Sequence, residues 1–217
     1  MRTDEIELRR QLVEYGKELL ELGLVQGTWG NLSVRLSNRY MITTPSGRDY
    51  MALTPRDMVK VDIKTLTYGD GGKPTSEKGL HAGVYELRRD VGAVIHTHSK
   101  YCSIFAAAGK PMHITDHDLA EKTGELIYLA DYAFAGTKAL TKNVLKALGQ
   151  RAGVIMSNHG MLCCGRDLPD AFEKAEAMEE AARRYIESKW EALKAPKASE
   201  VSEVSEAPKA SKTSNEA

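Results

Sequence analysis

The sequence predicts a mixed α/β fold in which short strands alternate with helices over residues 1–194. Apolar residues recur at helical spacing near the N-terminus, and short apolar or alternating runs bounded by turn residues follow it. The chain has 217 residues, enough to bury a substantial core without disulfide or metal staples. We therefore expect residues 1–194 to form a single domain.

The first part of the chain has the pattern of a helix followed by short strands. Leu8, Leu12, Tyr15, Leu19 and Leu22 follow a 4-3-4-3 rhythm, which predicts an amphipathic helix ending near Gly23. A glycine-rich loop comes next, and the alternation after it is typical of a half-buried strand. These elements are expected at 27–31 (loop) and at 32–36, 40–44, 58–62 and 65–68 (strands).

The second part alternates helices with apolar strands. Pro74, Thr75 and Ser76 predict the start of a helix that continues through Leu87. The segment 111–132 has no readable periodicity. Further strands are expected at 92–98, 152–157 and 161–164, and further helices at 99–108, 136–148 and 169–193.

The composition changes abruptly after residue 194. Ala-Pro-Lys-Ala-Ser occurs twice, and residues 195–217 contain no aromatic side chain. Such a segment buries too little apolar surface to offset its ordering entropy. We expect a disordered low-complexity tail at 195–217 that takes no part in catalysis.

Charge and cysteine usage exclude several classes of protein. Lysine plus arginine equals aspartate plus glutamate at 30 each, which disfavours nucleic acid as the main partner. We expect no membrane segment, because no stretch approaches the ~18 uncharged apolar residues that a span requires. The N-terminus lacks the apolar core of a signal peptide. Cys102, Cys163 and Cys164 do not suggest a disulfide framework, so a cytoplasmic location is expected.

Three histidines follow apolar runs of strand character. His96 and His98 are two residues apart, so in a strand their imidazoles would lie on the same face. His159 follows a second such run at 153–158. A third imidazole from another strand end would complete a three-nitrogen site, the usual protein contribution to a catalytic zinc.

Glu77 and three loops suggest an anion pocket beside this site. A carboxylate in a first helical turn is favoured by the helix dipole alone, but Glu77 could also serve as an acid/base near a metal. Thr75 and Ser76 offer hydroxyls and free N–H groups at a helix N-terminus. The loops 27–31 and 44–47 have the composition of phosphate cradles, although the same residues are also common in ordinary turns.

Five motifs, in this order, resemble the class II (zinc) aldolase and adducin-like family, most closely sugar-phosphate aldolases of the fuculose phosphate aldolase type. They are GTWGNLS at 27–33, TPSG at 44–47, PTSE at 74–77, VIHTHS at 94–99 and NHG at 158–160. The resemblance implies a three-layer α/β/α sandwich with a mainly antiparallel central sheet. It further implies a homotetramer with active sites between subunits.

The resemblance also implies roles for individual residues. Zn²⁺, or another divalent ion such as Mn²⁺ or Co²⁺, would be bound by His96, His98 and His159. Glu77 would act as the acid/base and as a fourth ligand before substrate arrives. Phosphate binding is carried over to Thr28, Asn31, Ser46, Gly47, Thr75 and Ser76.

The chain departs from the family pattern at two tyrosines. The aldolases have a catalytic tyrosine after the His-x-His strand, whereas the corresponding stretch here, 114–118, contains none. Asp116, His117 or Asp118 would take its place, and the spacing leaves all three open. A second tyrosine near the C-terminus of the aldolases has no counterpart after Tyr185.

The implied reaction is reversible cleavage of a ketose 1-phosphate to dihydroxyacetone phosphate and an aldehyde. The substrate would be of the fuculose-, deoxyribulose- or methylthioribulose-phosphate type. The same ligands also serve two alternatives, a methylthioribulose 1-phosphate dehydratase and a ribulose 5-phosphate 4-epimerase. A more remote alternative is a non-catalytic, adducin-like interaction domain that has lost the metal.

Overall fold

The computed structural model describes residues 3–69 and 72–194, which contain eight strands and six α-helices. The strands are β1 (Asn31–Arg35), β2 (Tyr40–Thr43), β3 (Val59–Asp62), β4 (Ala93–Thr97), β5 (Met112–His113), β6 (Leu126–Ala130), β7 (Gly153–Met156) and β8 (Gly160–Gly165). The helices are α1 (Thr3–Glu21), α2 (Lys78–Leu87), α3 (Lys100–Ala108), α4 (His117–Thr123), α5 (Lys138–Leu148) and α6 (Leu168–Lys194). Two short 3-10 turns lie at Tyr50–Ala52 and Pro55–Asp57.

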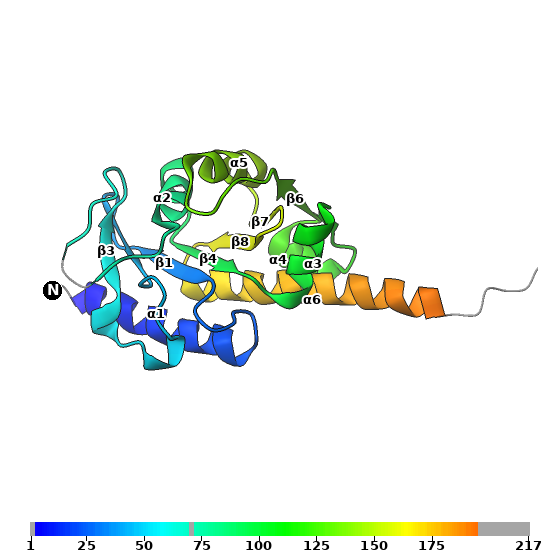
Figure 1. Cartoon of the computed structure of the whole chain (residues 1–217), viewed down its shortest axis with the longest axis horizontal. Coiled ribbons are helices and arrows are strands. Elements are labelled where there is room, and N and C mark those ends of the chain that lie inside the picture. The colour runs from blue at the N-terminus through cyan, green and yellow to red at the C-terminus, as the bar shows by residue number, and fades with distance from the viewer. Residues whose placement is uncertain (1–2, 70–71, 195–217) are drawn as a thin grey trace, which may run out of the picture.

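The eight strands form one sheet in the order β3-β2-β1-β4-β8-β7-β6-β5. Only the β6–β7 pair is parallel, and the other pairs are antiparallel. Helices α2 and α5 cover one face, while α1, α3, α4 and α6 cover the other (Figure 1). The expected three-layer α/β/α sandwich with a mainly antiparallel sheet is confirmed.

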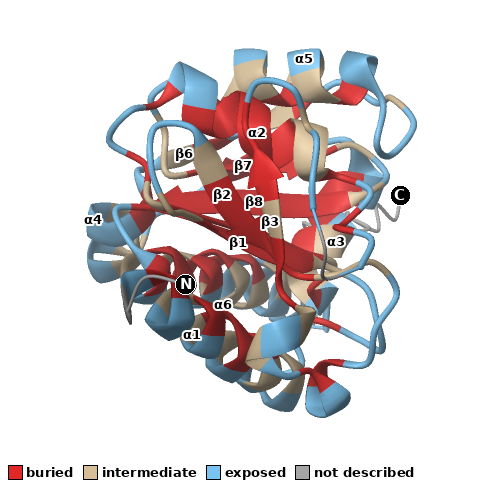
Figure 2. Ribbon diagram, turned by 90° about the vertical axis from the view of Figure 1, so that its left-hand side faces the viewer, coloured by how far each residue is buried: buried red, intermediate tan, exposed pale blue. Residues whose placement is uncertain are grey.

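Burial on both faces explains why the central strands are apolar along their whole length. Every residue of β4, β7 and β8 is buried, as expected for strands with helices on both sides. Figure 2 shows the buried residues concentrated in the sheet and on the helix surfaces turned towards it. One apolar core lies on the side of α1 and α6, and the other on the side of α2 and α5.

Two predicted boundaries in the loop region were wrong. Residues 65–68 do not form a strand: a turn ends at Thr65, and an isolated bridge joins Tyr68 to Val61. The helix expected from Pro74 begins at Lys78. The reason is that Pro74 forms a bridge with Pro45, so this segment pairs with a neighbouring loop before the helix starts.

The segment without readable periodicity contains β5, α4 and β6. These elements have 2, 7 and 5 residues, too few for a pattern to repeat. The expected tail at 195–217 lies outside the described residues. None of the helices in the described part of the chain combines the length and apolar composition needed to cross a membrane.

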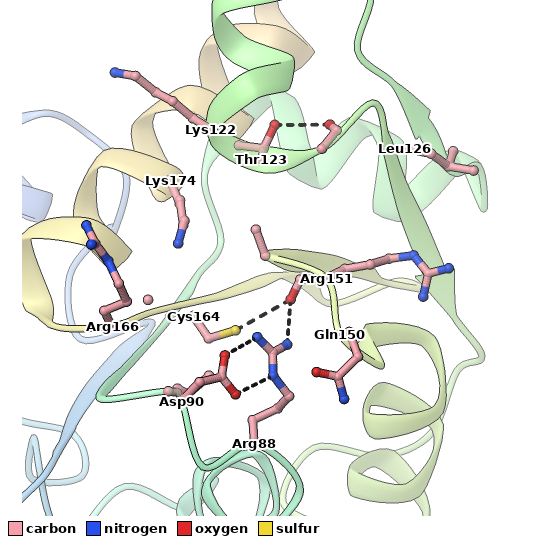
Figure 3. Close-up of a pocket in the computed structure, with 14 residues that line it drawn as sticks. Arg88, Asp90, Lys122, Thr123, Leu126, Gln150, Arg151, Cys164, Arg166 and Lys174 are labelled. Atoms are coloured by element: carbon pink, nitrogen blue, oxygen red, sulfur yellow. Dashed lines mark hydrogen bonds and ion pairs between the residues drawn. The ribbon is translucent and has the colours of Figure 1, made fainter.

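A network around Arg88 joins the α2–β4 and α5–β7 connections at the end of the sheet where β4 begins (Figure 3). The Arg88 guanidinium donates to both carboxylate oxygens of Asp90, at 2.9 and 2.6 Å. It also donates to the carbonyl oxygens of Gly149 and Arg151, at 3.2 and 3.1 Å. The Arg88 side chain is only 10% exposed, so its donors are satisfied within the protein by Asp90 and these carbonyls.

We predict that Arg88→Met lowers the free energy of unfolding by about 1–3 kcal/mol, because two backbone carbonyls and the largely exposed Asp90 carboxylate lose the buried guanidinium that donates to them. Arg88→Lys should recover only part of this, since one ammonium cannot reproduce the planar fork. The measurement is urea unfolding at fixed protein concentration.

Arg10→Met is the matched control, because Arg10 pairs with Glu7 while both side chains are about half exposed. It should change stability by less than about 0.5 kcal/mol. Equal losses for the Arg88 and Arg10 variants would contradict the structural role of the network.

Candidate metal centre and active site

The three candidate histidines come together at the end of the sheet where β4 ends: His96, His98 and His159. One nitrogen from each ring lies within 4.8 Å of the others. His96 belongs to β4, His98 follows its last residue, and His159 lies in the turn between β7 and β8. The expectation that the third histidine arrives from another strand end therefore agrees with the structure.

The turn that carries His159 has a backbone conformation that restricts which residues can occupy it. Asn158 has a φ of +51°, in the left-handed region that asparagine tolerates better than most residues. Gly160 lies so close to β4 that a Cβ atom would be 2.3 Å from the carbonyl oxygen of Thr97. Only glycine allows the turn to bring His159 against His98.

The protonation of His96 is set by its backbone partner. Its Nδ1 lies 2.8 Å from the carbonyl oxygen of Met161 and must donate to it. In the neutral ring, Nε2 is then an unprotonated lone pair. This atom faces His98 Nε2 at 2.9 Å and Glu77 Oε2 at 3.1 Å. Electron-rich atoms facing one another in this way fit a shared cation.

Glu77 supplies a carboxylate to the same point. It precedes α2 and is 4% exposed. Its Oε1 is 3.6 Å from His159 Nε2 and is buried without a hydrogen-bond partner among the described residues. An orphaned carboxylate oxygen beside three imidazoles is a donor set suited to a divalent metal, zinc in particular.

The electrostatics favour the metal-binding forms of His98, His159 and Glu77 at neutral pH. Burial lowers the pKa of His98 to about 4 and also lowers the pKa of His159. Burial acts to raise the pKa of Glu77, but His96 and the Asn31 amide outweigh it and the pKa is lowered. Neutral imidazoles and an ionised carboxylate are the forms that ligate metal.

A cavity of about 200 Å³ opens onto the histidines. It contains no lysine or arginine among its lining residues, so an anion there would meet hydroxyls and backbone N–H groups. All the candidate phosphate-binding and metal-binding residues line it: Thr28, Asn31, Ser46, Gly47, Thr75, Ser76, Glu77, His96, His98 and His159.

Backbone hydrogen bonds hold two of the candidate phosphate loops side by side. The N–H of Ser46 donates to the carbonyl of Lys73 at 2.9 Å, and the N–H of Thr75 donates to the carbonyl of Thr44 at 3.1 Å. This pairing explains why hydroxyls 30 residues apart in sequence face one cavity. The Asn31 amide, in contrast, is already bonded to Glu77 and His81.

Asp116, His117 and Asp118 do not line this cavity. Asp116 precedes α4, where it accepts from the backbone N–H of Leu119 at 3.1 Å and pairs with Arg184. The side chains of His117 and Asp118 are 91% and 95% exposed and pair with each other. Within one chain, none of the three is brought to the histidines.

Four residues that line the cavity were not among the candidate site residues: Trp29, Gly30, Pro45 and Ala135. The Trp29 ring lies 5.8 Å from the His98 ring and its residue is 61% exposed. Its position inside the first glycine loop was the available signal. Ala135 comes from the β6–α5 connection, which no sequence pattern placed near the histidines.

Comparison with known proteins gives one consistent answer. The family described as the class II aldolase and adducin N-terminal domain matches residues 10–186. A Rhodospirillum rubrum protein named 5-methylthioribulose-1-phosphate/5-deoxyribulose-1-phosphate aldolase is 36% identical over 185 residues, 85% of this chain and 83% of that protein. An Escherichia coli L-fuculose phosphate aldolase is 33% identical over 179 residues, 82% of each chain.

Solved structures agree with these relatives. An L-fuculose 1-phosphate aldolase matches with a TM-score of 0.80 at 34% identity, over 87% of this chain and 88% of the other. A Thermus thermophilus structure, at 21% identity, shares the fold with a TM-score of 0.78 over 90% of this chain and all of the other. The chain therefore belongs to the class II aldolase and adducin N-terminal domain family and is an enzyme of the aldolase, or lyase, class.

Proposed function

We propose that the protein is a zinc-dependent aldolase that reversibly cleaves a ketose 1-phosphate to dihydroxyacetone phosphate and an aldehyde. The observation that carries this proposal is the meeting of three imidazoles and a buried carboxylate in a hydroxyl-lined cavity. The names of the relatives support a substrate of the 5-deoxyribulose, 5-methylthioribulose or fuculose 1-phosphate type.

The metal would be held by His96, His98 and His159, with Glu77 as a further ligand before substrate binds. When bound there, zinc supplies Lewis-acid stabilisation of the negative charge that develops during carbon–carbon cleavage. The hydroxyls and N–H groups of the loops would bind the phosphate. The candidates are Thr28, Asn31, Ser46, Gly47, Thr75 and Ser76.

Glu77 is proposed to move the proton that completes cleavage. When the C3–C4 bond breaks, its electron pair stays on C3 and the C4 hydroxyl loses its proton to become an aldehyde. In the condensation direction the ionised Glu77 takes a proton from C3 of dihydroxyacetone phosphate. Cleavage is the reverse, so the protonated Glu77 returns that proton to C3 and dihydroxyacetone phosphate is formed. Its carboxylate is buried at the cavity wall, where water cannot compete for the transfer.

The base for the C4 hydroxyl is proposed to be Asp116, His117 or Asp118. Since these residues do not line the cavity of their own chain, they would have to reach it from a neighbouring subunit. This requirement supports a homotetramer with active sites between subunits. The exposure of His117 and Asp118 leaves them available for such a contact.

We also infer a cytoplasmic location. Cys102, Cys163 and Cys164 are all free and buried. Buried thiols without a disulfide framework are typical of proteins that work in a reducing compartment.

The function is tested by incubating the protein with a panel of ketose phosphates. Dihydroxyacetone phosphate should appear in step with substrate loss, detected by its reduction in a coupled NADH assay. The panel contains 5-methylthioribulose, 5-deoxyribulose and fuculose 1-phosphates and ribulose 5-phosphate. A dehydrated diketone without dihydroxyacetone phosphate would identify a dehydratase, and an epimerised pentulose would identify an epimerase.

We predict about one zinc per chain in the purified protein and a clearly lower zinc content for His98→Ala, because the substitution removes one of the three imidazoles that would hold the metal. Chelation should abolish turnover, and Zn²⁺, Mn²⁺ or Co²⁺ should restore it. His113→Asn is the control, since His113 is exposed and lines a different cavity. Metal analysis that finds no zinc and no turnover would favour a non-catalytic interaction domain.

Glu77→Gln should keep zinc and lower kcat by about 10²–10⁴-fold, because the amide preserves shape but cannot exchange the proton. Glu86→Gln is the matched control, an exposed glutamate on the helix that Glu77 precedes. Its turnover should remain unchanged. Near-normal turnover of Glu77→Gln would rule out the proposed proton transfer.

A further inference from the structure

A chain of buried hydrogen bonds runs from Glu77 into the layer between α2 and β1. Asn31 Nδ2 donates to Glu77 Oε2 at 3.1 Å, and Asn31 Oδ1 lies 2.5 Å from His81 Nε2. His81 Nδ1 lies 2.6 Å from the Ser33 hydroxyl, which is 2.8 Å from the Tyr85 hydroxyl. The series of hydrogen bonds ends in the protein interior, because its last three residues are completely buried: His81, Ser33 and Tyr85.

The regular spacing of the two elements builds this chain. Glu77, His81 and Tyr85 are four residues apart, a step of about 6 Å along a helix. Asn31 and Ser33 are two residues apart, a step of about 6.6 Å along a strand. Because the two repeats nearly match, side chains from α2 and from β1 alternate along the row of hydrogen bonds.

Chemistry assigns every hydrogen bond in the chain one direction. The Glu77 carboxylate only accepts, so the Asn31 amide must present its NH₂ group there and its oxygen to His81. His81 Nε2 must then carry the proton. The ring is completely buried, and its two nitrogens meet the Asn31 oxygen and the Ser33 hydroxyl and no carboxylate, so it is neutral and Nδ1 accepts. Ser33 therefore donates to His81, and Tyr85 donates to Ser33.

All the donors thus point towards the Glu77 carboxylate. We propose that Ser33, His81 and Tyr85 are positioning residues for Glu77, because their hydrogen bonds hold the Asn31 amide in the orientation that donates to the carboxylate. A flipped amide would turn its oxygen against the negative charge. Hydrogen bonds aligned in one direction also strengthen one another. The inference rests on the proposed role of Glu77 in proton transfer.

The first test is the protonation of His81 in the unmodified, zinc-loaded protein. Nitrogen-15 NMR of histidine-labelled protein at neutral pH should show a neutral ring protonated at Nε2. The signals are assigned through contacts with the Tyr85 ring. A ring protonated at Nδ1, or at both nitrogens, would overturn the proposed direction of the chain. This measurement requires neither a variant nor turnover.

The second test separates positioning from folding. Ser33→Ala removes the hydroxyl that donates to His81 Nδ1, and kcat should fall about 10-fold or more, as for outer partners of catalytic groups elsewhere. The KM for the ketose 1-phosphate should change little, because the candidate phosphate loops are untouched.

Thr43→Val is the matched control. Thr43 lies opposite Ser33 on β2, is equally buried, and donates its hydroxyl only to the neighbouring carbonyl of Thr44. Its kcat should stay near that of the unmutated protein. An unchanged kcat for Ser33→Ala, or equal losses in both variants, would contradict the positioning role.

Glu77→Gln, measured in parallel, distinguishes the two proposals. If it retains normal turnover, the proton transfer by Glu77 is wrong, whatever NMR shows for His81. If it loses turnover while His81 is protonated at Nδ1, the aldolase proposal stands and the hydrogen-bond chain is wrong.

Discussion

The site depends on the pairing of β4 between β1 and β8. In this register His96 lies opposite Asn31 on one side and opposite Leu162 on the other. The β7–β8 turn precedes Leu162 by only a few residues, so it brings His159 to the same edge. A shift of one residue would turn His96 to the other face of the sheet, and the nitrogen cluster would no longer exist.

The buried polar groups of the site are stable because almost all of them are paired. Asn31, His81, Ser33 and Tyr85 satisfy one another, which offsets the desolvation of burying them. Glu77 Oε1 is an exception among the described residues. An unpaired carboxylate oxygen is costly in a core unless a cation shares it, and its position beside the histidines gives the metal centre its physical rationale.

The two ends of strand β4 are surrounded by different polar groups. At the edge where β4 ends, the cavity has hydroxyls and no lysine or arginine among its lining residues, so balanced overall charge is compatible with binding a small phosphate. At the edge where β4 begins, Arg88 donates its hydrogen bonds to Asp90 and to backbone carbonyls. The candidate site and the Arg88 network therefore use separate sets of residues.

The sequence by itself determined the helices and strands with clear periodicity and the residue types of the candidate metal centre. His96 and His98 share a face through strand geometry alone, and local patterning placed α1, α5 and α6 within a few residues. Only the tertiary structure decided what depends on contacts between distant segments. The bridge between Pro45 and Pro74 delayed the start of α2, and the alternation of α2 with β1 joined His81 to Glu77. No local pattern encodes such pairings, because each depends on how two elements pack.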